Sequence, residues 1–474
     1  MSWLYDFWFI LVALLFLGLS IFVHELGHFL AAKRRGLVIK RFSIGFGPRI
    51  FGWEKNGVEY RLSAFPFGGY VALPQLVDMG RIEGGEGDEE EKLEGLPKIS
   101  YADKMIVSVM GAVFNVLFAL GLASVLYFFG HEVYSSELTT EVGYVAKELS
   151  VFDQKTEKEI TVPGPAFEVI QPGDKIAKVD GVEVRDFQDV RQRIVAGTGL
   201  TEDGKRVVHL QVERKGKTIE ADLFPVLIST EQMRMVGIGP KEIFYVGKLM
   251  EGRPLYVHPP ADNGLSVGDQ LWAVDGQRIH SFQGLKDHLQ ERGYGPLKVT
   301  VLKGGDSAKE VTYHLHSTEL TMKIGDRVST DYLIGFHREF QKTLTYPNPF
   351  TMIFNRMQDM YLTLTSLVNP KSDVKMRNMS GPVGIVDHLS VFAKIGWTRL
   401  FWFVVFINVN LAILNVLPIP VLDGGHMMFA TIEKLRGKPL PLAVLERLQV
   451  VFMVLIFSFM IYVTFFDVKR IFPS

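Results

Sequence analysis

Four long apolar segments constrain the fold of this chain more than any other feature of its sequence. They cover residues 7–23, 105–130, 400–422 and 450–466, and none of them contains a formal charge. At ~1.5 Å per residue, helices of this length can cover a hydrocarbon core ~30 Å thick. One such segment is compatible with a buried core helix. Four in one chain predict an integral membrane protein with four transmembrane helices.

The distribution of basic residues predicts the orientation of these helices. Eight Lys or Arg residues lie between positions 33 and 61, directly after the first apolar segment, and residues 1–6 before it contain none. The positive-inside rule places that basic loop in the cytoplasm. The amino terminus and the long segment between the second and third spans are then extracytoplasmic. The basic residues at 434–438 place the last loop inside again.

Composition narrows the chemistry that the chain can support. The formal net charge is −1, which gives no indication of a nucleic-acid partner. The chain contains no cysteine, so disulfides and thiolate metal sites are excluded. A zinc ion would have to be held by His, Asp or Glu.

The polar segment between the second and third spans contains an internal repeat. Residues 165–188 align without gaps on residues 260–283, and nine of these 24 positions are identical. In each copy, Gly-Asp opens a short strand, Asp-Gly predicts a tight turn, and an amphipathic helix and further strands follow. The copies resemble PDZ domains of the permuted bacterial kind, expected at residues 135–230 and 231–320. Two generic small α/β modules are the alternative.

Three further segments carry weaker signals. Residues 39–73 are rich in Phe, Gly and β-formers, and Asn56-Gly57 predicts a hairpin turn there. Residues 83–94 are acidic and Gly-rich, which favours a solvated loop without chemistry. Residues 348–368, within a segment expected at 340–395, show apolar residues at helical spacing. We expect them to lie on the outer membrane surface and to lead into the third span.

The end of the first apolar segment carries the pattern His24-Glu25-Leu26-Gly27-His28. On a helix the two histidines share a face and can bind one Zn²⁺. Glu25 adjoins the first ligand and can take a proton from a zinc-bound water. Ionisable groups at this depth in a membrane are costly unless they pair or ligate, which favours function. The alternative is a pair of structural histidines in a helix-packing seam.

A catalytic zinc needs a third protein ligand and an open position. Asp423 is a lone carboxylate after the uncharged third segment, and two glycines follow it. Pro418 and Pro420 are expected to break the helix there, which a membrane tolerates only where protein or water satisfies the backbone. Asp423 as an N-cap of the next helix, and His426 as a rival ligand, are the alternatives.

These features together resemble the site-2 protease family of intramembrane zinc metalloproteases. The resemblance rests on the His-Glu-x-x-His pattern in the first span, the tandem repeat, and Asn415-x-x-Pro-x-Pro-x-Leu-Asp-Gly in the third span, and it covers nearly the whole chain. It implies a polytopic α-helical membrane protein with four transmembrane helices, a membrane re-entrant β-sheet and two tandem extracytoplasmic PDZ domains. The expected segments are transmembrane helices at 1–33, 105–130, 398–425 and 445–468, and the cytoplasmic-side loop with its re-entrant β region at 34–104.

The resemblance also implies roles for individual residues. His24, His28 and Asp423 would be the zinc ligands, Glu25 the general base, and Asn415 a residue that holds the substrate backbone beside the zinc. The stretch at residues 380–385, Ser-Gly-Pro-Val-Gly-Ile, precedes the third span as it does in the family. The further residues expected to bind substrate are Gly45, Phe46, Gly47, Gly68, Gly69, Pro418 and Pro420.

The function implied is cleavage within the transmembrane segment of single-span membrane proteins. The expected substrates are an anti-sigma factor already trimmed by a first protease, in envelope stress signalling, and remnant signal peptides. The expected location is the bacterial inner membrane, with the PDZ domains periplasmic and the active site toward the cytoplasm. The PDZ pair would exclude bulky substrates, and ligand capture is the other reading.

Two other classes of function are compatible with parts of the sequence. A membrane-anchored PDZ scaffold without proteolytic activity would make the zinc motif fortuitous, but Glu25, Asn415 and Asp423 are all intact. A transporter would explain the broken helix at Pro418 and Pro420. The spans show no repeat among themselves, and the His-Glu-x-x-His pattern has no role in transport.

Overall fold

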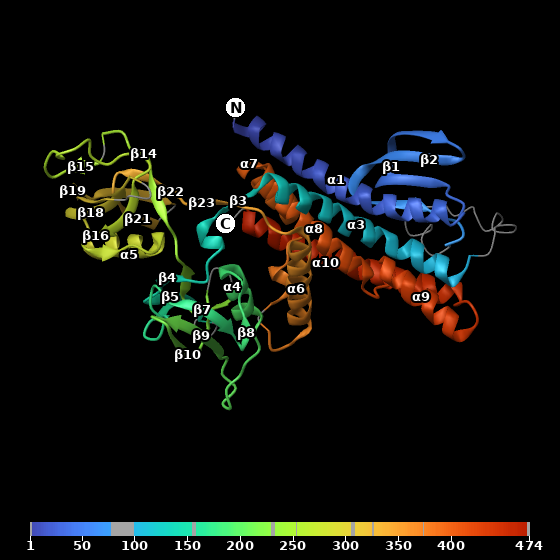
Figure 1. Ribbon diagram of the computed structural model, residues 1–474. Helices are drawn as coiled ribbons and strands as arrows, with labels where there is room; N and C mark the ends of the chain where they lie inside the picture. Colours follow the sequence, from blue (N-terminus) through green and yellow to red (C-terminus); the bar gives the residue numbers. More distant parts are fainter. Residues whose placement is uncertain are drawn as a thin grey trace. The chain divides into compact units, whose positions relative to one another are not determined.

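The computed structural model describes residues 2–76, 99–153, 158–228, 233–252, 254–304, 309–324, 327–372 and 374–471 (Figure 1). The acidic run predicted at 83–94 lies outside the described residues. The chain forms two compact units. One comprises Met1–His131, Thr345–Thr365 and Lys375–Ser474, and the other comprises Glu132–Leu344 and Ser366–Val374.

The first unit is built from long helices. Four helical segments are long and apolar enough to cross a membrane, by length and composition: Asp6–Arg34, Tyr101–Phe129, Trp397–Val416 and Ala443–Ile471. The prediction of four spans is therefore confirmed. The helices are α1 (Ser2–Arg34), α3 (Tyr101–Phe129), α6 (Pro349–Val368), α7 (Pro382–Ile395), α8 (Trp397–Val416), α9 (Asp423–Arg436) and α10 (Leu442–Ile471).

The predicted third span differs from one continuous helix. The segment expected at 398–425 is divided between α8, which ends at Val416, and α9, which begins at Asp423. Pro418 and Pro420 lie in the connection, so the prolines end the helix as the sequence indicates. The helix predicted within residues 348–368 is present as α6.

Helix α3 is the central element of this unit and packs against both α1 and α8 (Figure 1). Its buried positions are mainly small residues, including Gly111, Ala112, Ala119 and Ala123. Small side chains let helix backbones approach closely, which is what favours helix association in lipid. A capping box between Ser100 and Asp103 begins α3.

Helix α10 is tied to α7 by one buried carboxylate. Asp467, 1% exposed, accepts hydrogen bonds from the backbone N–H groups of Gly381 and Gly384, each at 2.9 Å. These groups belong to the first turn of α7, where helix N–H groups have no partner within the helix. Arg470 also forms an ion pair with Asp467 at 2.8 Å and donates to the Met379 carbonyl. The stretch at residues 380–385 thus supplies the backbone donors that bind the Asp467 side chain of α10.

A small β-sheet follows α1. Strands β1 (Arg41–Lys55) and β2 (Val58–Ala72) meet at Asn56-Gly57, where both residues have positive φ, 53° and 74°. This confirms the predicted hairpin turn. Residues 41–44 pair with both 59–62 and 69–72, while residues 49–55 pair with 58–63. The hairpin therefore folds back on itself, and 49–55 and 69–72 form its outer strands.

The second unit contains the sequence repeat in two copies, each with its own buried core. The first copy has a sheet of order β10-β9-β7-β8 with helix α4 (Phe187–Ala196), and the second has a sheet of order β15-β19-β18-β16-β14-β22 with helix α5 (Phe282–Arg292). The strands of the first copy are β4 (Val142–Val145), β5 (Glu148–Asp153), β6 (Lys158–Pro163), β7 (Lys175–Val179), β8 (Val182–Glu183), β9 (Val208–Arg214), β10 (Lys217–Leu223), β11 (Val226–Leu227), β12 (Arg234–Met235) and β13 (Ile238–Pro240).

The strands of the second copy continue to Phe340. They are β14 (Phe244–Leu249), β15 (Leu255–Tyr256), β16 (Gln270–Val274), β17 (Gln277–Arg278), β18 (Pro296–Lys303), β19 (Lys309–His316), β20 (Thr318–Ile324), β21 (Arg327–Leu333) and β22 (Phe336–Phe340). The expected limit at residue 320 falls short because β22 completes the sheet beside β14. Strands β3 (His131–Tyr134) and β23 (Lys342–Thr345) pair with each other at the ends of this unit.

Identical residues in the repeat make identical contacts. Asp180 and Asp275 adopt positive φ, 48° and 51°, in the predicted Asp-Gly turns. Each carboxylate accepts a backbone N–H of the neighbouring strand at 2.9 Å, from His209 and Lys298. The shared sequence therefore marks a duplicated structural framework.

Candidate active site

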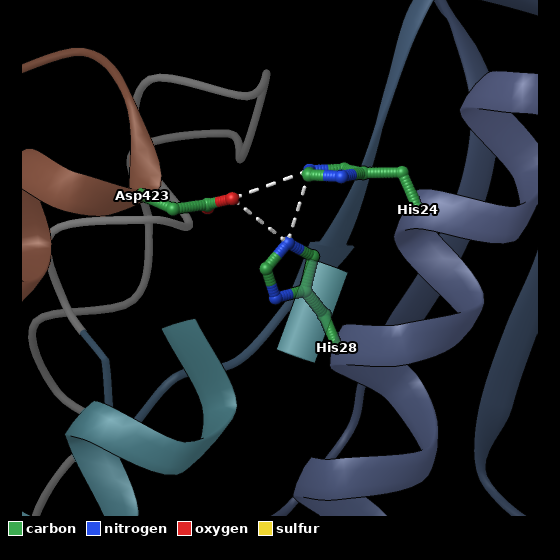
Figure 2. Close-up of side chains that lie close together, drawn as sticks. All are labelled: His24, His28 and Asp423. Atoms are coloured by element: carbon green, nitrogen blue, oxygen red, sulfur yellow. Dashed lines mark hydrogen bonds and ion pairs between the residues drawn. The ribbon is translucent and has the colours of Figure 1, made fainter. Parts of the chain in front are cut away.

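Three predicted ligand side chains from two distant parts of the chain meet inside the helical unit. His24 and His28 lie one turn apart on α1, and Asp423 is the first residue of α9 (Figure 2). The two Nε2 atoms are 3.2 Å apart, and Asp423 Oδ2 lies 3.3 Å from that of His24 and 3.4 Å from that of His28. Within the described part of the chain, this is the group of His, Asp and Glu side chains that could hold a metal.

The connection between α8 and α9 positions Asp423. A Cβ atom at Gly424 would lie 2.2 Å from the Leu417 carbonyl oxygen, and one at Gly425 would lie 2.3 Å from that of Ile419. Only glycine permits the first turn of α9 to rest on this loop. Asp423 is a helical residue and not the cap, which is Leu422. His426 is not part of the metal-capable group, so the geometry favours Asp423 as the third ligand.

Helix α3 closes one side of the histidine pair. A Cβ at Gly111 would lie 2.4 Å from His28 Nε2 and 2.6 Å from His24 Cε1. His28 Nδ1 lies 2.8 Å from the Val107 carbonyl oxygen, and His24 Nδ1 lies 3.2 Å from Asn115 Nδ2. Both imidazoles therefore contact α3 through the nitrogen that faces away from Asp423.

Two predicted functional residues lie against the same histidines. Asn415, near the end of α8, places its Nδ2 3.3 Å from His24 Nε2, on the side that faces Asp423. Glu25 is buried, with 7% exposure. A Cβ at Gly69 would lie 2.8 Å from Glu25 Cγ, so β2 touches α1 at this glutamate.

The other predicted substrate-binding residues lie in the sheet and in the loop. Gly45 and Gly47 have positive φ, 83° and 87°, and form the bend of β1 around Phe46, whose backbone lies opposite Phe65. Gly68, with φ 93°, precedes the contact made by Gly69. In the α8–α9 connection, Pro418 is exposed and Pro420 is buried.

The sequence profile of Peptidase family M50 matches residues 12–459 of this chain. The chain belongs to peptidase family M50. Similar proteins include a regulator of sigma E protease of Salmonella typhi, 28% identical over 93% of each chain, and the regulator of sigma-W protease RasP of Bacillus subtilis, 27% identical over 98% of this chain and 99% of the relative. The zinc metalloprotease RasP of Bacillus licheniformis is 26% identical over the same shares.

This M50 peptidase is thus a zinc metalloprotease of the site-2 type, which acts in regulated intramembrane proteolysis. Among solved structures, the PDZ domain of the SdrC-like protein of Listeria monocytogenes is similar to part of the chain. It shows 23% identity over 21% of this chain and 87% of that one, with a TM-score of 0.15.

The side chains of the M50 peptidase fit a zinc ion. Zinc bonds of ~2.0–2.1 Å in a tetrahedral site separate the ligand atoms by about 3.3–3.4 Å, and the observed separations are 3.2–3.4 Å. The Val107 carbonyl can only accept, so the His28 proton is on Nδ1 and the Nε2 lone pair faces Asp423. Asp423 Oδ2 is buried and has no hydrogen-bond partner, although both imidazoles lie within ion-pair distance. A cation shared by these three atoms would satisfy the buried electron pairs of all of them.

Three residues of this site escaped the sequence analysis: Val107, Gly111 and Asn115. All lie in the second apolar segment, which was read only as a span. Asn115 carries the signal that could have identified them, because it is a polar amide inside a charge-free apolar run, four residues after a glycine. The backbone role of Val107 leaves no trace in sequence.

Proposed function

We propose that this M50 peptidase cuts peptide bonds within the transmembrane segments of single-span membrane proteins. His24, His28 and Asp423 hold the zinc, and Glu25 is the general base. The observation that carries the proposal is the meeting of three ligand atoms at 3.2–3.4 Å within a unit of four apolar helices. The transmembrane segment of the substrate lies in the bilayer, and the helices around the site are long and apolar enough to lie in the bilayer as well.

The residues of the chain divide the work of hydrolysis. When bound, Zn²⁺ polarises a carbonyl and makes water nucleophilic near neutral pH. Glu25 follows His24 on α1 and is held in a buried position against Gly69, where it takes a proton from the attacking water and passes it to the leaving nitrogen. Asn415 lies beside His24 and donates its amide hydrogens to the substrate backbone.

The small sheet supplies a second requirement. A transmembrane helix shields its peptide bonds by internal hydrogen bonding, so it must unwind locally before it can be cut, and unsatisfied backbone groups in lipid cost several kcal/mol each. An extended substrate added to the outer strand at 69–72 would regain those bonds. The contact between Gly69 and Glu25 supports this, because it brings that strand to the proposed base. In this proposal the sheet re-enters the membrane, with the bend at Gly45-Phe46-Gly47 and Gly68 shaping its edge, and Pro418 and Pro420 keep the α8–α9 loop open to substrate.

The substrates proposed are anti-sigma factors trimmed by an earlier protease and remnant signal peptides. Relatives named as regulators of sigma-E and sigma-W proteases support the first class. The enzyme would lie in the bacterial inner membrane. The basic loop after α1 supports a cytoplasmic active site, with the repeat unit in the periplasm.

The repeat copies, as tandem PDZ domains, would exclude substrates with bulky external domains. The duplicated framework with two separate cores supports two independent domains of this size. Deletion of residues 142–320 is then expected to permit cleavage of untrimmed substrates. If the shortened enzyme still rejects them while cutting trimmed ones, the filter is wrong and ligand capture is favoured.

The decisive experiment compares purified wild-type protein with Glu25→Gln. A single-span substrate is offered with and without its external domain, and zinc is quantified in both proteins. We expect about one zinc per chain in each and cleavage by wild type alone, because Gln cannot accept the proton. Cleavage by Glu25→Gln at the wild-type rate would refute the general base. Zinc without cleavage of either substrate form would favour the membrane-anchored scaffold, and absence of zinc would refute the ligand set.

A further inference from the structure

Helix α3 contributes no proposed metal ligand, yet it touches both imidazoles on their outer nitrogens. Val107, Gly111 and Asn115 are spaced by four residues and so lie along one face of the helix. The Val107 carbonyl meets His28 Nδ1, the Asn115 amide meets His24 Nδ1, and Gly111 between them leaves room for the two rings. The two histidines are thus held in the same way by one helix, once by backbone and once by a side chain.

The proton positions follow from the side of each ring that faces Asp423. Both rings present Nε2 toward Asp423, so ligation through Nε2 requires the hydrogen to be on Nδ1 in each. A ligating histidine commonly donates that hydrogen to a carbonyl or carboxylate, which fixes the tautomer and the ring plane. For His28 the acceptor is the Val107 carbonyl. For His24 the group in reach is the amide of Asn115.

A carboxamide can either donate or accept a hydrogen bond, because its nitrogen carries hydrogens and its oxygen is an acceptor. Asn115 Nδ2 faces His24, and its Oδ1 is buried without a partner. Rotation of the amide by 180° exchanges the two ends and pairs the oxygen with the N–H of His24. Only this orientation leaves the Nε2 lone pair free for a metal.

We propose that Asn115 is a positioning residue of the metal centre, whose carboxamide oxygen accepts the Nδ1 hydrogen of His24 and holds Nε2 toward His28 and Asp423. This inference rests on the ligand set proposed above. A packing role alone does not account for the residue. Asn115 is 0% exposed between Ala112 and Ala119, and a buried amide costs free energy unless it is hydrogen-bonded.

The test uses the full-length protein in detergent, with the variants Asn115→Leu and Asn115→Asp. Asn408→Leu is the matched control, because Asn408 is also a fully buried amide in a spanning helix but donates to Ser20 and the Val404 carbonyl. Zinc affinity is measured by competition with a chelator, the visible absorption of the Co²⁺-loaded protein reports ligand geometry, and thermal unfolding is recorded for the metal-stripped protein.

We expect Asn115→Leu to bind zinc about 10–100-fold more weakly than wild type, the usual cost of losing an outer partner of a ligand. Its Co²⁺ spectrum should change while the stripped protein unfolds as wild type does. Asn115→Asp, which keeps an acceptor, should restore affinity to within a few-fold, and Asn408→Leu should bind as wild type.

Three results would overturn the inference while leaving the ligand set intact. Wild-type affinity in Asn115→Leu would remove the role of Asn115 while leaving the ligand set intact. Equal loss in Asn115→Leu and Asn115→Asp would show that an acceptor is not what His24 needs. A stripped Asn115→Leu protein that unfolds at lower temperature, with an unchanged Co²⁺ spectrum, would assign the residue to helix packing. Absence of zinc from wild type would instead refute the ligand set, and the role of Asn115 with it.

Discussion

Asp423 and Asp467 are both buried carboxylates of the helical unit, 8% and 1% exposed, but they face opposite kinds of atoms. Asp467 is surrounded by donors: two backbone N–H groups of α7 and the guanidinium of Arg470. Asp423 lies beside two imidazole nitrogens, the hydrogen of His28 is on the nitrogen that faces away from it, and its Oδ2 has no hydrogen bond. The protein itself supplies hydrogen-bond donors to the first carboxylate, whereas the second is grouped with two imidazoles that could hold a cation together with it.

The atoms around a buried carboxylate distinguish one that stabilises a helix contact from one that belongs to a metal site. A carboxylate whose partners are all protein donors stabilises a helix contact, because each donor has been withdrawn from water along with it. A carboxylate grouped with other acceptors is stable only when something positive is added.

Asp423→Ala removes one of three ligands and should weaken zinc binding by at least about 100-fold, more than the loss of an outer partner would. Cleavage should fall with it. Zinc content after dialysis and turnover of a single-span substrate measure the two effects. Asp467→Asn is the control and should retain zinc. If Asp423→Ala keeps its zinc, Asp423 is not a zinc ligand and the proposed difference between the two carboxylates is wrong.

Asp467→Leu should leave zinc affinity unchanged and lower the stability of the helical unit. Two buried N–H groups lose their acceptor, at about 1–3 kcal/mol each for a full loss. Thermal unfolding in detergent measures this, and Asp467→Asn, which keeps an oxygen acceptor, should lose less. A drop in zinc affinity equal to that of Asp423→Ala would contradict the structural assignment.

Two glycines allow the same contrast without changing any charge. In Gly111→Ala the added Cβ collides with His28 Nε2 at 2.4 Å, and in Gly384→Ala it collides with Asp467 Oδ1 at 2.6 Å. Overpacking of this kind costs about 1–3 kcal/mol. We expect Gly111→Ala to lose zinc affinity and Gly384→Ala to lose thermal stability. Gly121→Ala on α3, where a Cβ meets nothing within 4 Å, should do neither. If Gly111→Ala and Gly384→Ala lost zinc affinity and thermal stability to the same extent, the proposed difference between the two carboxylates would be refuted.

Asp174 in the repeat unit is a buried carboxylate comparable to Asp467, and its replacement has the smallest expected effect. Burial acts to raise the pKa of Asp174, but two-point donation from Arg214 and the Gln171 N–H outweighs it and leaves the pKa below its usual value. Because the folded-state pKa is depressed, the stabilisation is present above the unfolded-state value of ~3.9 and is lost as pH falls through the folded-state pKa.

Asp174→Asn should therefore cost about 1 kcal/mol at neutral pH and progressively less as the pH falls below the unfolded-state pKa toward the lower folded-state pKa. Hydrogen exchange of peptides covering β7 and β9 in the full-length protein measures the difference. A variant that matches wild type at pH 7, or a gap that does not close in acid, would show that the ion pair is not what holds this carboxylate.

The predictability of this molecule depends on how far apart the interacting residues lie in sequence. His24 and His28 are one helical turn apart, so local spacing was sufficient to predict them as a pair, and the prolines before Asp423 were sufficient to predict the break in the third span. Asn56-Gly57 and the Asp-Gly turns of the repeat were equally local. Asp423 was assigned with the aid of a resemblance, since no spacing relates it to α1.

Contacts between distant segments could not be predicted from spacing. The glycines at 381 and 384 were noticed only as part of a motif, and their partner Asp467 lies 86 and 83 residues away. Gly111 and Asn115 belong to a run whose apolar character indicates a span and hides a polar face. The division of the third span into α8 and α9 was visible from its prolines, but how Gly424 and Gly425 rest on that loop was not.

The bare backbone of α3 at Gly111 has a consequence for inhibitor design. Because not even a methyl group fits between this helix and the two rings, no chelating compound can reach the metal position from that side. The contact of Gly69 with Glu25 restricts a second direction. Asn415 and the partly exposed ring of His24 lie on a different side of the metal position, so a zinc-directed inhibitor is expected to bring its chelating group in along the α8–α9 loop.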